Sequence, residues 1–285
     1  MTKHSAVLLL SCPDRKGIVA AISGFIAQHE GNILHADEHN DRDSNTFLMR
    51  VEFDPADLDL PLRDFVSQFS RVANQFAMQW RLALSDVRQR MAILVSKYDH
   101  CLVDLLYRRQ SGELACDIPC IVSNHAESQP IADFYQVPFF LVPVEKDSKQ
   151  AAEQQILERL EGHAVDFIVL ARYMQILSTD FVNKYPNRII NIHHSFLPAF
   201  VGSKPYHQAF ERGVKLIGAT SHYVTEVLDD GPIIEQDVVR VSHRDSVEDL
   251  IQKGRDLEKV VLSRAVRWHI ENRVLLYGNK TVVFE

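Results

Sequence analysis

The amino-acid sequence predicts an α/β protein of two domains: a ferredoxin-like βαββαβ domain over residues 1–87, and a doubly wound, mostly parallel sheet over residues 88–285. Three observations lead to this expectation. The chain has 285 residues, which exceeds the usual length of one domain. The N-terminal third follows the strand and helix order of the split βαβ unit. Apolar strands then alternate with helical stretches through the rest of the chain.

The first domain is expected to begin with a buried strand over Ala6–Ser11 and a helix over Pro13–His29. The apolar face of this helix would consist of Ile18, Val19, Ile22, Phe25 and Ile26. A strand over Asn32–Asn40 follows, and strict alternation predicts another through Phe47, Met49, Val51 and Phe53. A second helix carries Phe65, Phe69, Val72 and Phe76, and the alternation of Trp80, Leu82 and Leu84 predicts the last strand.

A polar stretch, Ser85–Arg90, separates the two patterns, so we expect the domain boundary near residue 88. The predicted strands of the second domain are Met91–Ser96, Ile118–Ser123, Phe139–Val142, Phe167–Ala171 and Ile189–Ile192, with helices around 101–109, 127–136, 148–162 and 178–184. A helix over Tyr206–Arg212, strands over Leu216–Val224 and Ile233–Val241, and a long amphipathic helix from Ser246 to about Glu271 follow. This repeated order is typical of a doubly wound sheet.

Composition and charge exclude several classes of function. The net charge is -7 and no Lys/Arg run is long enough to follow a phosphate backbone, which argues against a nucleic-acid partner. The apolar run Ala6–Leu10 is too short for a signal peptide, and no run has the length of a membrane span. The four cysteines, Cys12, Cys101, Cys116 and Cys120, have no disulfide spacing. We therefore expect a cytoplasmic protein with neither a nucleic-acid nor a membrane partner.

Polar residues with complementary chemistry follow one of the predicted strands. Asn191 and His193 are two residues apart at the end of that strand, so their side chains leave the same face. Open parallel sheets place their active sites at this edge. A carboxylate, Asp229 or Asp230, precedes Gly231 in a turn that can aim it inward. An amide, an imidazole and a carboxylate can together add water or an amine to an activated carbonyl.

These motifs resemble a known family. The segments Asn191–Phe200 (NIHHSFLPAF), Gly202, Pro205–Gly213, Gly218–Val224 and Leu228–Ile234 are similar to the core of the folate-dependent formyltransferase fold, and specifically to the formyltetrahydrofolate deformylases. The first domain resembles an ACT domain, through Cys12–Gly17 and Gly31–Ile33. The resemblance implies that Asn191, His193 and Asp229 are catalytic, and it alone selects Asp229 over Asp230.

The resemblance implies a hydrolase that acts on a linear amide C–N bond and converts 10-formyltetrahydrofolate and water to formate and tetrahydrofolate. Such an enzyme would balance the one-carbon folate pool and supply formate for purine synthesis. The folate would be the substrate, and we expect no cofactor and no metal. Asp229 would deprotonate the water or hold the imidazolium form of His193, and Asn191 and His193 would stabilise the oxyanion.

Two features favour a hydrolase over a transferase. In the more distantly similar glycinamide ribonucleotide transformylases, a glycine-rich loop after the first strand holds the acceptor's phosphate. The corresponding segment here, Ser96–Leu102, has no glycine. His194 stands where the synthetic enzymes typically have proline, and a double histidine is the deformylase pattern. His194 either takes part in the reaction or is a supporting residue, and the sequence leaves both open.

Further residues admit two interpretations. The segment after a buried strand, Arg172, Tyr173, Met174, Gln175, Ile176 and Leu177, is either ordinary core or, as the resemblance implies, the folate-binding loop of the pterin pocket. We favour the second interpretation. His207 and His222 are expected to be structural, because His207 lies on a helix and His222 in the middle of a strand.

The ACT resemblance implies an effector site for a small amino acid, near Asp14, Gly17, Asn32 and Ile33. Glycine and methionine are the candidate effectors, since both are linked to the one-carbon pool. ACT domains commonly pair, which implies a homo-oligomer, with a tetramer as the candidate form. A helix entry is the alternative role of Asp14, which would lie near the positive end of the helix dipole.

Three other functions remain open at this point. A formyltransferase with an amine acceptor would use the same three residues and differ near Lys97 and His100. A methionyl-tRNA formyltransferase is disfavoured by the acidic chain. A sensor without enzymatic activity would have no need of the complete Asn, His and Asp set.

Overall fold

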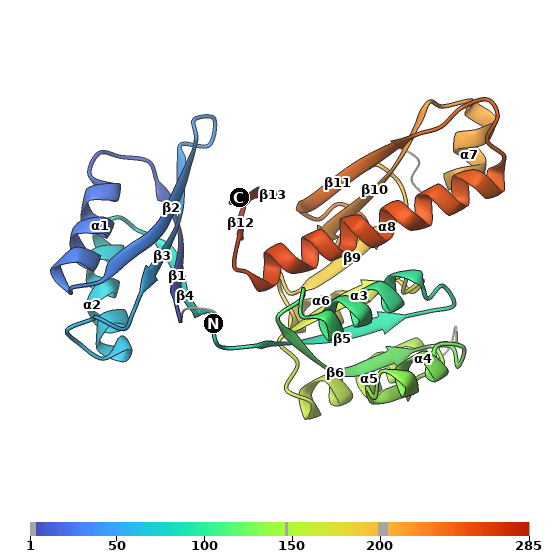
Figure 1. The fold of residues 1–285 in the computed structure, drawn as a ribbon, viewed down its shortest axis with the longest axis horizontal. Helices are drawn as coiled ribbons and strands as arrows, with labels where there is room; N and C mark the ends of the chain where they lie inside the picture. The colour runs from blue at the N-terminus through green and yellow to red at the C-terminus, as the bar shows by residue number, and fades with distance from the viewer. Residues whose placement is uncertain (1–3, 146–147, 199–204, 285) are drawn as a thin grey trace. The chain divides into compact units, whose positions relative to one another are not determined.

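The computed structural model describes residues 4–145, 148–198 and 205–284, and the chain forms two compact units (Figure 1). One unit holds Met1–Arg88 together with Glu271–Glu285, and the other holds Gln89–Ile270. The break after Arg88 lies where the polar stretch predicts it, but the segment from Glu271 onward groups with the first unit instead of the second. Phe200 and Gly202, which belong to the motif quoted above, lie outside the described residues.

The first unit has the predicted βαββαβ order: β1 (Ala6–Pro13), α1 (Ile18–Gln28), β2 (Asn32–Asp41), β3 (Thr46–Asp54), α2 (Leu62–Gln75) and β4 (Gln79–Leu84). The sheet order is β2-β3-β1-β4, and neighbouring strands are antiparallel. Alternate residues of β1, such as Leu8 and Leu10, pack with Phe65 and Phe69 of α2 and with the apolar face of α1. Both helices therefore cover one face of the sheet.

The structure corrects the predicted start of the first helix. Strand β1 continues to Pro13, which pairs with Thr46, and Gly17 has a left-handed φ of 95°, so α1 begins only at Ile18. A left-handed residue cannot continue a helix, and glycine adopts that conformation without strain. Val19, expected on the buried face, is 41% exposed.

A C-terminal hairpin is absent from the sequence prediction. Strands β12 (Val274–Tyr277) and β13 (Lys280–Val283) pair with each other, and Leu275 and Phe284 pack against Val7, Leu9 and Leu48. Those three residues belong to β1 and β3 and point away from α1 and α2. The hairpin thus buries the second face of the sheet, which explains why the C-terminal segment belongs to the first unit.

The second unit is built on a seven-stranded sheet of order β11-β10-β9-β8-β5-β6-β7. Its strands are β5 (Gln89–Val95), β6 (Cys116–Ser123), β7 (Phe139–Leu141), β8 (Phe167–Ala171), β9 (Ile189–His193), β10 (Leu216–Tyr223) and β11 (Ile233–Arg240). The strands from β7 to β9 are parallel, and β10 and β11 are antiparallel additions. The predicted mostly parallel sheet is therefore confirmed.

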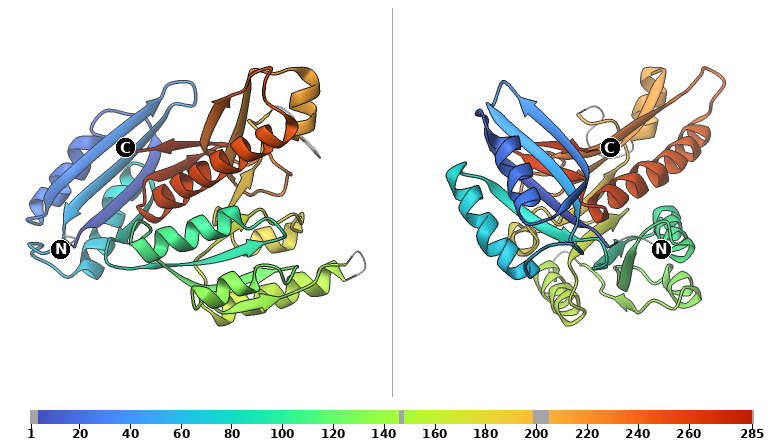
Figure 2. Two further views of the ribbon diagram at one scale, coloured as in Figure 1. Left: turned by 45° about the vertical axis from the view of Figure 1, so that its right-hand side comes forward. Right: turned by 60° about the vertical axis from the view of Figure 1, so that its left-hand side comes forward.

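Helices cover both faces of this sheet, as expected for a doubly wound fold. They are α3 (His100–Ser111), α4 (Gln129–Phe134), α5 (Lys149–Gly162), α6 (Thr179–Lys184), α7 (Pro205–Arg212) and α8 (Val247–Ile270). Helices α3 and α8 lie side by side on one face, and α5 packs on the other (Figures 1 and 2). No helix among the described residues is long and apolar enough to cross a lipid bilayer.

The strand order reverses beside β5. From β5 the chain proceeds outward through β6 and β7, and β8 then returns to the other side of β5 and is followed by β9. A crevice forms at the carboxyl ends of the strands at such a switch point, and it is the usual ligand site of open α/β sheets. The polar residues predicted at the ends of β8 and β9 fall at this edge.

Candidate active site

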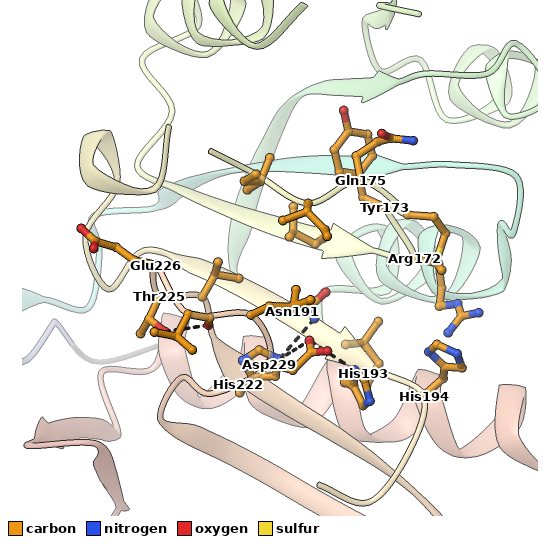
Figure 3. Close-up of a pocket in the computed structure, with 18 residues that line it drawn as sticks. Arg172, Tyr173, Gln175, Asn191, His193, His194, His222, Thr225, Glu226 and Asp229 are labelled. Atoms are coloured by element: carbon orange, nitrogen blue, oxygen red, sulfur yellow. Dashed lines mark hydrogen bonds and ion pairs between the residues drawn. The ribbon is translucent and has the colours of Figure 1, made fainter. Parts of the chain in front are cut away.

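The ends of β8 and β9 open into a cavity of about 370 Å³ (Figure 3). It is lined by Leu170, Arg172, Tyr173, Met174, Gln175, Ile176, Leu177, Asn191, Ile192, His193, His194, His222, Val224, Thr225, Glu226, Val227, Leu228 and Asp229. The structure therefore brings the three residues predicted to be catalytic and the six predicted to bind folate around one space. They come from segments almost 60 residues apart in sequence (Arg172 to Asp229).

Asn191 is held by a histidine on the neighbouring strand. Antiparallel pairing of β9 with β10 places His222 directly opposite Asn191, and the two side chains are bonded, with 3.2 Å between Asn191 Nδ2 and His222 Nε2. His222 Nδ1 donates to the carbonyl oxygen of Tyr223 at 2.9 Å, so Nε2 is the acceptor in the neutral ring. Burial lowers the pKa of His222 and keeps it neutral. One amide hydrogen of Asn191 is thus committed to His222, and the other is available to a ligand.

Asp229 reaches the cavity from a loop with an unusual backbone. Its φ is 56°, in the left-handed region that costs an aspartate some strain. Gly231 follows where a Cβ would overlap the carbonyl oxygen of Tyr223, so only glycine allows the chain to pass there. Asp229 Oδ1 lies 3.3 Å from His193 Nδ1. Asp230 is exposed and does not line the cavity, so Asp229 is the carboxylate that faces the histidine.

The contact with Asp229 determines which nitrogen of His193 carries the proton. A carboxylate only accepts, so His193 Nδ1–H donates to it, and this hydrogen bond lowers the pKa of Asp229. His193 is 6% exposed, and its Nε2 is buried without a hydrogen-bond partner among the described residues. In the neutral ring Nε2 is then a free acceptor, and it becomes a donor when the ring is protonated. Figure 3 shows Asn191, His193, His222 and Asp229 gathered together.

The loop after β8 forms one wall of the cavity and is fixed at both ends. Arg172 has a left-handed φ of 64°, and its carbonyl accepts from the backbone N–H of Ser96 at 3.3 Å. Ser96 Oγ in turn accepts from the N–H of Met174 at 3.0 Å. At the far end, the buried Glu153 accepts from the N–H of Ser178 at 2.9 Å. The loop thus presents a preformed wall to a ligand.

The opposite wall was not predicted from the sequence. It consists of His222 and the segment Val224–Leu228, which follows β10. His222 was expected to be structural in mid-strand; the structure instead places it one residue before the end of β10, beside the cavity. The antiparallel direction of β10 brings this end to Asn191, and local sequence patterns do not reveal strand direction.

Large apolar side chains surround the mouth of the cavity. Met174, Ile176, Val227 and Leu228 are 54%, 59%, 61% and 58% exposed, respectively. Two of them belong to each wall, so together they form an apolar rim around the polar cluster. Such a site accommodates a flat, partly apolar ligand that delivers a polar group to the interior.

His194 separates this cavity from a second one. It borders both, and burial, followed by the positive charge of Arg172, lowers its pKa to about 4. His194 is therefore neutral near pH 7. His207, expected to be structural on its helix, lines the second cavity from α7.

One group of potential metal ligands lies beside this second cavity. Donor atoms of His100, Cys101 and Glu258 lie within 4.8 Å of one another. His100 Nε2 is already bonded to Glu258 Oε2 at 2.8 Å, and burial raises the pKa of the Cys101 thiol well above its ordinary value. A protonated thiol and an internally paired carboxylate fit a structural hydrogen-bonded cluster.

The predicted effector residues do not meet within one chain. Asp14 and Gly17 precede α1, whereas Asn32 and Ile33 follow its other end. The helix has 11 residues, so the two pairs are separated by roughly 16 Å along its axis at about 1.5 Å per residue. A site that used both pairs would need a second copy of the unit.

Comparisons with known proteins agree with this architecture. Residues 89–266 match the family model described as formyl transferase, and residues 6–67 match the ACT domain. A formyltetrahydrofolate deformylase of Synechocystis sp. is 56% identical over 100% of both chains, and that of Bacillus subtilis is 50% identical over 97% of this chain and 93% of its own.

Solved structures give the same result. The crystal structure of a formyltetrahydrofolate deformylase from Pseudomonas syringae pv. tomato is 49% identical, covers 100% of this chain and 96% of its own, and has a TM-score of 0.98. A glycinamide ribonucleotide transformylase from Symbiobacterium toebii is 30% identical with a TM-score of 0.67, and the match covers 98% of that chain but 72% of this one. Sequence identity of 49–56% to these deformylases over 97–100% of this chain shows that the chain belongs to the formyltetrahydrofolate deformylase family.

Proposed function

We propose that this protein hydrolyses 10-formyltetrahydrofolate to formate and tetrahydrofolate. The observation that carries the proposal is the cluster of Asn191, His193 and Asp229 in one cavity, in a chain that is similar over its whole length to formyltetrahydrofolate deformylases. The reaction would balance formylated against free tetrahydrofolate and release formate for purine synthesis. The folate acts as substrate, so the chemistry below uses only the protein's own side chains.

The proposed folate position follows from the two walls of the cavity. The pterin lies along the loop Arg172–Leu177, which Ser96 holds in place through the Arg172 carbonyl and the Met174 N–H, and other backbone groups of the loop recognise the ring edges. The apolar rim contacts the flat faces of the ligand, and the formyl group extends toward Asn191 and His193. Preformed walls favour binding because little ordering is needed when the ligand enters.

The proposed reaction begins with a water molecule between His193 and the formyl carbon. His193 Nε2 takes one proton from this water while its oxygen forms a bond to the carbonyl carbon. Asp229, 3.3 Å from Nδ1, stabilises the resulting imidazolium. The free amide hydrogen of Asn191 donates to the oxyanion, a contribution worth about 3–4 kcal/mol for one such donor. Nε2–H then protonates N10, the C–N bond breaks, and formic acid loses its proton to give formate.

The first test is product release by the purified protein in the absence of an amine acceptor. We expect tetrahydrofolate and formate in equal amounts from 10-formyltetrahydrofolate. Formyl transfer that occurs only when an amine is added would contradict the proposal and favour a transferase. Asn191→Ala should lower kcat by about 10²–10³ with a small change in KM, because its amide acts mainly on the oxyanion.

We also propose that the first unit binds a small amino acid between two copies of the chain. Its support is the ACT match and the separation of Asp14 and Gly17 from Asn32 and Ile33 by the length of α1. Glycine and methionine are the effectors to test, by their influence on activity and on Tm, alongside the oligomeric state from light scattering. A monomer whose activity and Tm respond to neither amino acid would contradict this proposal.

A further inference from the structure

A second cavity of about 230 Å³ lies beside the first and shares Arg172, Met174 and His194 with it. Its other walls come from Tyr98 and His100 after β5, from α7, and from Arg255 and Glu258 of α8. The reaction proposed above makes no use of this space. Because the two cavities share three wall residues, the second lies next to the space in which the proposed product forms.

The charges around the second cavity favour an anion. Glu258 is 1% exposed and accepts hydrogen bonds from Tyr206 at 2.6 Å and His100 at 2.8 Å, which leaves its charge well satisfied. Arg172 and Arg255 supply two positive charges against this single carboxylate. Both guanidinium groups lie over the ring of Tyr98, at 5.4 Å and 5.3 Å from its centroid.

Arg172 has unused hydrogen-bonding capacity in this position. Arg172 is 8% exposed, and its Nη1 atom is buried with no hydrogen-bond partner among the described residues. Its Nε lies 3.5 Å from Glu258 Oε2, so the ion pair with that carboxylate leaves Nη1 for another acceptor. Figure 3 shows the guanidinium beside the His194 ring, and both residues line the two cavities. A buried donor of this kind is costly unless a ligand satisfies it.

We infer that the second cavity is a binding site for the formate product, held by Arg172 and Arg255. This inference rests on the proposed hydrolysis, which releases a monoanionic carboxylate beside Arg172. A planar carboxylate matches the fork of N–H donors of a guanidinium. The cavity is also of suitable size, because a water molecule takes up about 30 Å³, so a formate ion and several waters fit while a folate does not.

Inhibition of hydrolysis by sodium formate tests this inference, with sodium chloride at equal ionic strength as the salt control. Formate should inhibit the wild-type protein without competing with 10-formyltetrahydrofolate, because it occupies a separate space. Arg255→Gln should raise the inhibition constant for formate about tenfold, the loss of one charge-assisted contact. Arg267→Gln, an exposed position on the same helix and outside the cavity, should leave it within about twofold.

Direct binding keeps the inference separate from the proposed function. The linewidth of [¹³C]formate is measured with wild-type protein and with both variants, in the absence of turnover. Binding that is weakened by Arg255→Gln and not by Arg267→Gln supports the site whether or not hydrolysis is observed. Absence of formate binding, equal binding in both variants, or purely competitive inhibition would overturn it. If inorganic phosphate displaced formate at a concentration lower than that of formate, the inference would also be overturned, and the cavity would be a phosphate-binding site instead.

Discussion

Replacing Asp229 by asparagine tests the central assignment with little disturbance to the fold. The two side chains have nearly the same shape, so the change removes a charge and preserves packing. Asparagine also tolerates the left-handed φ of 56° at this position. The variant is therefore expected to fold normally, which makes a loss of activity attributable to the missing carboxylate.

The expected loss follows from the distance between Asp229 and His193. At 3.3 Å between Oδ1 and Nδ1, a carboxylate and an imidazolium attract each other by about 5 kcal/mol at an effective dielectric constant of about 20. This attraction exists only when His193 is protonated, so it lowers the barrier rather than tightening substrate binding. An energy of about 5 kcal/mol corresponds to a factor between 10³ and 10⁴ in rate. Solvent near the half-buried Asp229 weakens the attraction, so we expect kcat to fall about 10³-fold.

The assay is steady-state formation of tetrahydrofolate from 10-formyltetrahydrofolate. KM is expected to change less than about threefold, because the charge of Asp229 acts mainly on the imidazolium that forms during the reaction and not on substrate binding. Asp230→Asn is the matched control, since it removes the adjacent carboxylate from the same turn and should keep nearly full activity. A kcat for Asp229→Asn within tenfold of wild type would refute the assigned role. Equal losses in both variants would show that the charge of the whole turn matters, not the contact with His193.

Three further outcomes are expected. His222→Leu should lower kcat about tenfold or more with KM almost unchanged, because Asn191 loses the acceptor that orients its amide; an unchanged kcat would mean that His222 only packs. The folded-state pKa of His194 is lowered to about 4, so the unfolded chain binds more protons than the folded chain between about pH 6.5 and pH 4, and stability should fall as the pH falls through that range. Over the same range, the Tm of the wild-type protein should fall more steeply than the Tm of His194→Gln. Parallel curves for the two proteins would exclude His194 as the cause. Gly231→Ala should destabilise the protein by more than about 2 kcal/mol in urea unfolding, whereas Gly162→Ala, which meets open space, should not, and a near-neutral Gly231→Ala would contradict the steric argument.

The sequence predicts most strands and helices because their apolar residues repeat with a clear period. Alternation through Phe47, Met49 and Val51, for example, corresponds to a strand with one face on the helical layer. Asn191 and His193 were predictable for a related reason, since a strand end and a spacing of two residues are local features. The start of α1 was not, because the same residues after Cys12 suit either a longer strand or an early helix.

Long-range features could not be read from the chain in this way. Whether β10 runs parallel or antiparallel to β9 decides whether His222 meets Asn191, and no local pattern encodes that direction. The hairpin β12–β13 is short and partly polar, and its apolar side chains find their partners more than 200 residues earlier in β1. Family resemblance supplied the choice of Asp229 over Asp230, and the backbone conformation at Asp229 gives the physical reason for it.

The position of the C-terminal hairpin also affects how the protein is made. The residues that complete the first unit leave the ribosome only after the entire second unit, from Gln89 to Ile270. At roughly 5–20 residues per second, the face of the sheet formed by Val7, Leu9 and Leu48 waits about 10–40 s for Leu275 and Phe284 to cover it. A chain that ends early therefore keeps an exposed apolar sheet face even when its second unit has folded. Truncated products should thus be recognised by chaperones and proteases through this exposed face.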